Sequence, residues 1–213
     1  MSTNSIKMSK KNIAILTILF TIILDQVIKI YIKTNFVLGE EVVVFDWFKI
    51  HFVENNGMAM GFEFGGKAGK LFLTVFRLVA VTAIMYWLIG NIKTKVHNAV
   101  IIAISLIFSG AVGNIIDSVF YGAIFDDSTN KVATLFADEP YGSIFHGKVV
   151  DMFYFPIWRG DLPSWIPFIG GEPYTFFQYI FNPADAYITL GVALLFIFSK
   201  QAFPKEEKKV VRE

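Results

Sequence analysis

The chain has 213 residues, of which 54% are hydrophobic and 17% are charged, against roughly 25% charged residues in a typical soluble domain. This composition excludes a disordered chain and disfavours a soluble globule, and the net charge of +1 gives no general attraction to nucleic acid, so no nucleic-acid partner is expected. The absence of cysteine excludes a disulfide framework, a thiol nucleophile and Cys-ligated metal sites. The remaining class is an α-helical integral membrane protein.

Four apolar stretches are long enough to cross a bilayer as helices, which takes about 20 residues each. They run over about 12–32, 71–90, 98–116 and 184–203. The first stretch follows several lysines but no small-x-small cleavage site comes after it, so we expect a retained anchor and not a signal peptide. The prediction is four transmembrane helices in a single membrane domain, 1–213.

Basic residues in short segments predict the orientation. They lie before the first span, between the second and third, and after the fourth: Lys7, Lys10, Lys11, Lys93, Lys95, Lys205, Lys208, Lys209 and Arg212. Because such segments stay in the cytoplasm, both termini are expected to be cytoplasmic. The two longer connections, about 33–70 and 117–183, would then lie on the outer face of the membrane.

The first outer loop contains two segments of strand character, Val42–Phe45 and Phe48–Val53, which predict a small β-sheet there. The second outer loop contains two inserts. The insert at 122–146 is polar, and the insert at 158–179 is rich in Pro, Gly and aromatic residues. Because Trp and Tyr favour bilayer interfaces, we expect the second insert to lie flat at the headgroups.

Charged side chains within the spans are costly and therefore informative. Asp25 and Lys29 lie four residues apart on one face of the first helix, as an internal ion pair or as a contact for substrate. Arg77 lies two turns into the second span and has two open interpretations. It either reaches a lipid phosphate or pairs inward with a carboxylate.

The third span ends in small and polar residues. Gly110 and Gly113 allow the close approach of another helix, either of this chain or of a substrate. Asn114 and Asp117 are three residues apart and share a face near the outer boundary. The pattern indicates a packing groove with a hydrogen-bonding network beside it.

Two further carboxylates follow. Asp151 lies in an apolar run. Asp185 lies in the first turn of the predicted fourth helix, after Asn182, a residue type favoured at the N-cap, and a proline at the first helical position. An acid in a first turn is often only a capping residue, because the helix dipole favours its ionised form. The predicted topology, however, brings a set of polar residues together near the outer interface: Asp25, Asn55, Asn114, Asp117, Asp151 and Asp185.

The sequence contains no His-Glu-x-x-His motif, no Gly-x-Ser-x-Gly elbow and no glycine-rich phosphate loop. Two aspartates at the outer face are therefore the best catalytic candidates. Close carboxylates do not both ionise readily, so one takes a proton from water while the other, protonated, polarises a peptide carbonyl. This chemistry calls for no metal and no cofactor.

Five ordered blocks resemble the bacterial lipoprotein signal peptidases (signal peptidase II), a family of intramembrane aspartic endopeptidases. The blocks are Asp25-Gln26-x-x-Lys29, Asn55-Asn56-Gly57-Met58-Ala59-Met60-Gly61, Gly110-Ala-x-Gly113-Asn114-x-x-Asp117, Val149-Val150-Asp151 and Phe181-Asn182-x-Ala184-Asp185. Each block alone is weakly specific, but five in order on a four-span frame are a specific signal.

The resemblance implies that Asp151 and Asp185 form the catalytic dyad. It also implies that a second set of residues positions substrate or supports the dyad: Asp25, Lys29, Asn55, Gly57, Asn114, Asp117 and Asn182. The implied substrate is a diacylglyceryl-modified prolipoprotein, cut just before its lipidated cysteine. Membrane lipid and globomycin-type cyclic peptide inhibitors are the other implied partners.

The sequence departs from the family pattern in three ways. Ser118 stands where the family usually has arginine, so the ion pair of that arginine must be absent or replaced. Met58 and Met60 stand where smaller and aromatic residues are common. The inserts lengthen the spacing between the acidic blocks, and we expect them to form an enlarged lid or rim over the site. Unchanged cleavage after deletion of 126–138 would contradict that hypothesis.

Two alternatives come from other functional classes. A small transporter would use the buried acids to carry protons or cations, but the acids gather at one face and no ionisable path crosses the membrane. A non-catalytic scaffold would leave Asp151 and Asp185 with no reason to meet. Replacing each aspartate by asparagine distinguishes these alternatives, because it removes proton transfer while keeping the size of the side chain.

Overall fold

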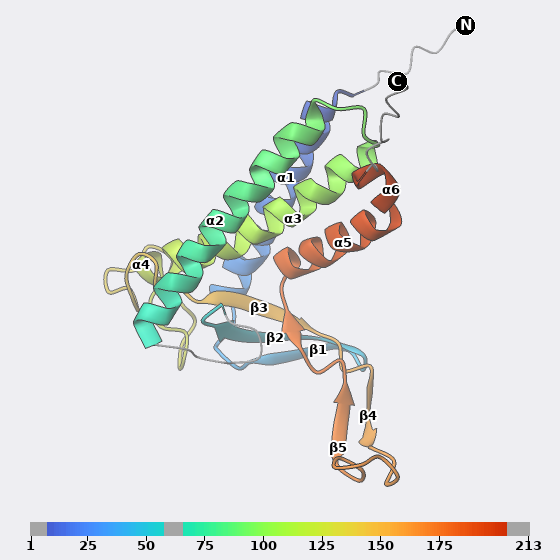
Figure 1. Ribbon diagram of the computed structural model, residues 1–213. Helices are drawn as coiled ribbons and strands as arrows, with labels where there is room; N and C mark the ends of the chain where they lie inside the picture. The colour runs from blue at the N-terminus through green and yellow to red at the C-terminus, as the bar shows by residue number, and fades with distance from the viewer. Residues whose placement is uncertain (1–7, 58–65, 204–213) are drawn as a thin grey trace, which may run out of the picture.

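A bundle of apolar helices lies at one end of the molecule and a β-sheet layer at the other (Figure 1). The computed structural model describes residues 8–57 and 66–203. Several residues of the sequence analysis therefore lie outside the described residues: Lys7, Met58, Ala59, Met60, Gly61, Lys205, Lys208, Lys209 and Arg212.

Three helices in the described part of the chain are long and apolar enough to cross a membrane. They cover α1 (Lys10–Lys33), residues 68–92 of α2 (Gly66–Ile92), and α3 (Asn98–Ile116) with its extension to Ile124. The first three predicted spans are thus confirmed as helices. The mostly apolar sequence of each helix and its lack of proline explain these lengths.

The fourth predicted span is a shorter helix. α5 (Pro183–Ile197) ends after 15 residues, and the four-residue α6 (Ser199–Ala202) follows it. At 1.5 Å per residue, α5 is about 22 Å long, less than the roughly 30 Å of a bilayer core. The count of four crossings therefore remains a prediction.

The end of α3 differs from the predicted boundary at residue 116. The chain continues as a π-helical turn, η2 (Asp117–Tyr121), and a short helix, α4 (Gly122–Ile124). The returning part of the first insert satisfies the carbonyl groups of this wide turn: Phe145 N donates to Val119 O and Gly147 N donates to Ser118 O, both at 2.9 Å. The insert is thus built onto the end of α3.

The main sheet has the order β1-β2-β3-β6, and every pair in it is antiparallel. Its strands are β1 (Glu41–Phe45), β2 (Phe48–Asn55), β3 (Val149–Tyr154) and β6 (Ile180–Phe181). The two strands predicted in the first loop are confirmed. The sheet extends beyond the first loop, because β3 and β6 come from the second loop.

The second insert forms a separate hairpin of β4 (Trp158–Asp161) and β5 (Pro173–Phe176), which extends from the sheet away from the helices (Figure 1). Backbone hydrogen bonds between Leu162 and Glu172 and between Gly171 and Leu162 close its tip. Its position at the lipid headgroups remains a prediction.

The glycine-lined face of α3 packs against helices of this same chain. A Cβ atom on Gly110 would collide with the carbonyl oxygen of Ala184, and one on Gly113 would lie 2.5 Å from Asp25 Oδ2. This face could have accepted a helix of this chain or a helix of a substrate. In the structure, two helices of this chain, α5 and α1, pack there. The close approach carries Asn114 at the end of α3 to the start of α5.

Candidate active site

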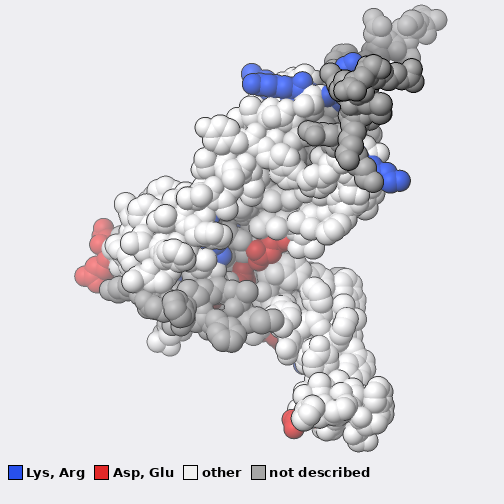
Figure 2. All heavy atoms as spheres, in the orientation of Figure 1, with Lys and Arg blue, Asp and Glu red and all other residues white. Residues whose placement is uncertain are grey.

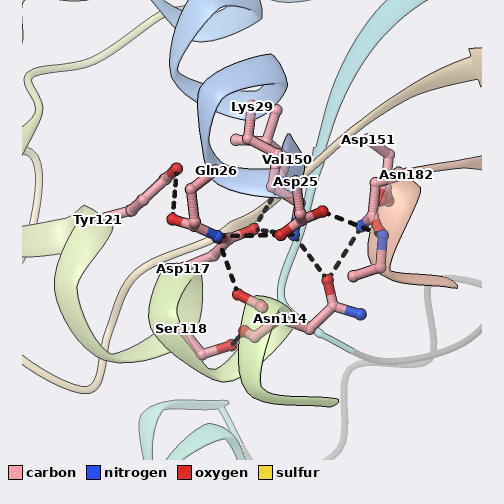
Figure 3. Close-up of polar contacts among 12 residues, drawn as sticks. Asp25, Gln26, Lys29, Asn114, Asp117, Ser118, Tyr121, Val150, Asp151 and Asn182 are labelled. Carbon is pink, nitrogen blue, oxygen red and sulfur yellow. Dashed lines mark hydrogen bonds and ion pairs between the residues drawn. The ribbon is translucent and has the colours of Figure 1, made fainter. Parts of the chain in front are cut away.

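Polar residues from five separate elements meet where the helix bundle joins the sheet (Figure 3). α1 supplies Asp25, Gln26 and Lys29, β2 supplies Asn55, α3 with its π turn supplies Asn114 and Asp117, β3 supplies Asp151, and the start of α5 supplies Asn182 and Asp185. Figure 2 shows carboxylate atoms at the surface between the helices and the sheet layer. The predicted convergence is thus present in the structure.

Asp151 is held in the middle of β3 by two amide groups. Asn182 Nδ2 donates to Asp151 Oδ1 at 2.6 Å, and Asn55 Nδ2 donates to Asp151 Oδ2 from the neighbouring strand. The side chain is only 4% exposed. Burial, helped by the negative charge of Asp185, raises the pKa of Asp151 to about 7, and the two amides and Lys29 partly oppose that rise.

Asp185 lies in the first turn of α5 and takes part in the cap of that helix. Asn182 Oδ1 accepts from Asp185 N at 3.0 Å, and Asn182 N donates back to Asp185 Oδ2 at 3.4 Å, which is a capping box. Asn114 Nδ2 donates to Asp185 Oδ1 at 2.8 Å. The predicted N-cap is confirmed, and Asp185 is half-buried, more open than Asp151.

Asn182 joins the two aspartates. Its side-chain oxygen caps α5 at Asp185 while its nitrogen contacts Asp151 and also Asn114 Oδ1, at 3.1 Å. The amide is fully buried. Since one side chain contacts both residues, any shift of α5 relative to β3 would change the geometry of the pair.

Lys29 balances the charge behind the aspartates. Its ammonium group lies 3.1 Å from Asp25 Oδ2 and 2.8 Å from Asp117 Oδ2, and it donates to Asn114 Oδ1 at 2.9 Å. The predicted Asp25–Lys29 ion pair is confirmed, and Asp117 joins it from α3. Because Lys29 is fully buried, both carboxylates serve to compensate its charge.

Asp25 and Asp117 also hold backbone groups of the elements that carry the candidate pair. Asp25 Oδ1 accepts from Ala184 N at 3.0 Å, next to Asp185, and Asp117 Oδ2 accepts from Val150 N at 3.3 Å, next to Asp151. Each carboxylate thus fixes the neighbour of one candidate residue. This arrangement favours a supporting role for Asp25 and Asp117.

The loop after β2 is held by its own contacts. Gly57 has a φ of +84°, and its N–H donates to Asn55 Oδ1 at 2.5 Å. Arg77 donates to the carbonyl of Gly57. The contact of Arg77 is therefore inward, and its partner is a backbone carbonyl, which differs from the carboxylate and the lipid phosphate of the two sequence interpretations.

Tyr121 is the residue of this network that the sequence analysis missed. Its hydroxyl donates to Gln26 Oε1 at 3.1 Å, and Gln26 Nε2 donates to Asp25 Oδ2 and to Asp117 Oδ1, both at 3.0 Å. The available signal was its spacing of four residues after Asp117, which places both on one helical face. Ser118, at the position of the missing arginine, donates to Asn114 O at 2.9 Å.

The arrangement has the features of a coupled acid–base pair. Asn182 donates to the carboxylate of Asp151 and accepts from the backbone N–H of Asp185, the Asp151 carboxyl is buried with a pKa near neutrality, and Asp185 is more open. Among residues 8–57 and 66–203, no three side chains of the metal-binding types gather into a cluster. One carboxyl group of the pair can remove a proton from water while the other donates a proton to a carbonyl oxygen.

Comparison with known proteins gives consistent matches over most of the chain. The family described as Signal peptidase (SPase) II matches residues 17–201. A lipoprotein signal peptidase of Porphyromonas gingivalis is 50% identical over 182 residues, which cover 84% of this chain and 79% of that protein. One of Amoebophilus asiaticus is 34% identical over 199 residues, covering 90% of this chain and 79% of the relative.

The fold is similar to that of a bacterial membrane enzyme solved by the in meso method at 2.3 Å resolution. The TM-score is 0.56 at 27% identity, and the match covers 93% of this chain and 94% of the solved one. A second solved bacterial membrane enzyme gives a TM-score of 0.55 at 26% identity, covering 91% and 94% of the two chains.

Proposed function

Because the chain belongs to the signal peptidase II family and is therefore a membrane aspartic peptidase that removes signal peptides from lipoproteins, we propose that Asp151 and Asp185 are its catalytic dyad. The observation that carries the proposal is the shared contact of Asn182 with both residues. The scaffold alternative gives these two side chains no reason to meet.

Within this dyad, Asp151 holds the proton and Asp185 acts as the base. Support comes from the burial of Asp151, which favours its neutral form near pH 7, and from the greater openness of Asp185. Asp185 removes a proton from water, the water oxygen bonds to the scissile carbonyl carbon, and Asp151 donates its proton to the carbonyl oxygen. When the C–N bond breaks, the amine leaves with the proton that Asp185 received, the carbonyl group forms again, and the proton on its oxygen returns to Asp151.

The substrate of the proposed reaction is a prolipoprotein that already carries diacylglycerol on its lipobox cysteine, and the bond before that cysteine is cut. Such a substrate is a membrane helix with its scissile bond near the outer interface. The start of α5 and the strand β3, which carry the dyad, lie where the helices meet the sheet (Figure 1), which supports a site near that interface. Asn55 and Asn114 donate to the two aspartates and Gly57 donates to Asn55, and we assign all three to orienting the substrate or the aspartates.

The enzyme is a bacterial membrane protein, and we place it in the inner membrane with both termini in the cytoplasm and the dyad near the periplasmic face. Lysines at the end of the bundle where α1 begins and α2 ends support this orientation (Figure 2). Those within the described residues include Lys10, Lys93 and Lys95.

The test uses the purified protein with a diacylglyceryl-modified prolipoprotein and with the same precursor left unmodified. The proposal predicts cleavage of the modified precursor only, with the lipidated cysteine as the new N-terminal residue by mass spectrometry, and inhibition by globomycin. Equal cleavage of both precursors, or a new N-terminus at another residue, would contradict it.

A further inference from the structure

The strands that carry Asn55 and Asp151 have a second face, and the first insert covers it. Because side chains alternate along a strand, Glu54 on β2 and Val150 and Met152 on β3 point away from the Asn55–Asp151 face. Val150 and Met152 are fully buried in one apolar cluster with residues of the extended α3 and the insert: Tyr121, Phe125 and Ala133. The insert therefore packs behind the two strands.

A buried ion pair lies at the centre of this contact. The ammonium group of Lys33, at the end of α1, pairs with Glu54 and donates to Ser128 Oγ of the insert at 2.9 Å. It also lies 5.2 Å and 5.0 Å from the ring centroids of Phe125 and Tyr141. Lys33 is fully buried, so one cation connects α1, β2 and the insert.

Further contacts close the connection on both sides. Lys148 Nζ lies 3.3 Å from Glu54 Oε2, and Lys148 N donates to Tyr141 OH at 2.8 Å, which ties the start of β3 to the same glutamate and the same insert. Ala133 N donates to Lys33 O at 3.3 Å. Glu54, one residue before Asn55, thus forms ion pairs with Lys33 of α1 and with Lys148 at the start of β3.

We propose that Lys33, Glu54 and the insert residues Ser128 and Tyr141 form a brace that positions Asn55 against Asp151 from behind the sheet. The proposal rests on the proposed function, because it takes Asp151 as catalytic. Lys33 and Glu54 act through Asn55 and are positioning residues. The role differs from that of a lid, since the described contacts of the insert are with the far face of the strands.

Glu54 can influence the position of Asn55 because the two residues are adjacent on β2. Adjacent residues of a strand move together, so a shift of Glu54 displaces the amide that donates to Asp151. Small misplacements at a reacting centre are costly: about 1 Å lowers rates by roughly 100-fold. The buried Lys33–Glu54 pair is therefore assigned to fixing the position of β2 relative to α1, and not to adding stability.

The experiment compares two double variants. Lys33→Met with Glu54→Gln removes both charges together, because a lone buried charge would disturb the fold more than their joint loss. Lys131→Met with Asp126→Asn is the matched control, since this ion pair belongs to the same insert but Lys131 is 62% exposed. Both are assayed for kcat and KM on the diacylglyceryl-modified prolipoprotein, and for thermal unfolding in detergent.

The brace variant is expected to lose roughly 10- to 100-fold in kcat with KM changed less than about twofold, whereas the control keeps both values. Loss of the Asn55 hydrogen bond raises the pKa of Asp151, so its titration moves to higher pH, as in Asn55→Ala. Ser128→Ala, which removes one Lys33 hydrogen bond and leaves no new charge, gives a smaller effect of the same sign and replaces the double variant if that fails to fold.

The titration of Asp151 is read by infrared difference spectroscopy of its carboxyl band, with Asp151→Asn as the blank. An unchanged kcat and an unchanged titration in the folded brace variant would overturn the proposal. The spectroscopic reading needs no substrate and decides on the brace even if the wild type cleaves nothing, a result that would count against the proposed function separately.

Discussion

Two asparagine side chains contact the candidate aspartates, because Asn114 donates to Asp185 and Asn182 donates to Asp151. Each is fixed by a second partner, because Asn114 accepts from Lys29 and Asn182 caps α5. A hydrogen bond to a charged group contributes about 1.5–3 kcal/mol, which is enough to decide the position of a carboxylate.

We therefore expect Asn182→Ala to lower kcat/KM by roughly 10- to 100-fold, since it removes the donor to Asp151 and the cap of Asp185 together. Steady-state cleavage of the modified prolipoprotein measures the loss. Asn12→Ala serves as a comparison. Asn12 lies at the start of α1, far along that helix from its site residues Asp25 and Lys29, and its backbone N–H donates to Ser9 Oγ. Equal activity in both variants would show that Asn182 has no part in the site.

The pH dependence follows from the raised pKa of Asp151. With a pKa of about 7, the carboxyl is mostly protonated below neutral pH and loses its proton as the pH rises. Since the protonated form is the one that polarises the carbonyl, kcat/KM should fall above about pH 7. A profile of kcat/KM from pH 5 to 9 checks this. A rate that instead rises through pH 7 would assign the proton-donating role to Asp185.

At the residue scale, much of the site could be predicted because its chemistry depends on residue type and on helical spacing. Asp25 with Lys29, and Asn182 as a cap, follow from distances of three or four residues along the chain. The pairing of Lys29 with Asp117 and the link from Asn182 to Asp151 join distant segments, and no local pattern specifies them.

At the element scale, α3 is the support of the site, because α1, α2 and α5 all pack on it. Its glycines permit this closeness at Ala184, beside Asp185. The length of α3 was harder to predict, since the π turn after Ile116 depends on donors that come from the insert, more than 20 residues later.

Gly113→Ala tests the α3 contact. The added methyl group would lie 2.5 Å from Asp25 Oδ2, so Asp25 must move away from Ala184 N, at a cost of about 1–3 kcal/mol in stability and with reduced cleavage. Gly90→Ala in α2 is the matched control, because nothing lies within 4 Å of its Cβ. Unfolding in detergent measures both. Similar stability in the two variants would contradict this account of the packing.

The sheet shows why elements from distant segments are hard to predict. β1 and β2 form a local hairpin with clear strand character, so their position could be predicted. β3 has an apolar sequence that suits several structures, and its partner β2 lies about a hundred residues earlier. Only the tertiary pairing shows that Asp151 lies on a strand beside Asn55.

At the scale of the whole molecule, lysines gather at the end where α1 begins and α2 ends, and the sheet and hairpin lie at the other end (Figures 1 and 2). The helical class, and the order of the elements along the chain, could be predicted from hydropathy. The direction of the β4–β5 hairpin could not, because an aromatic-rich segment suits a membrane interface and a protein surface equally well.

The absence of cysteine makes the orientation directly testable. Lys95→Cys and Trp165→Cys place single thiols at exposed positions at the two ends of the molecule. A membrane-impermeant maleimide added to cells with a permeabilised outer membrane should label the thiol at position 165 at once, and the thiol at position 95 only after the inner membrane is opened. The reverse pattern would place the dyad on the cytoplasmic side.

The central claim is that Asp151 and Asp185 cleave the lipoprotein together, and the most direct measurement compares wild type, Asp151→Asn and Asp185→Asn on one diacylglyceryl-modified prolipoprotein. Thermal unfolding in detergent confirms that each variant is folded. The account predicts a loss of roughly 100- to 10,000-fold in kcat for each variant, because each removes one proton-transfer group. Turnover near the wild-type rate in either folded variant would show that the residue is not part of the catalytic pair.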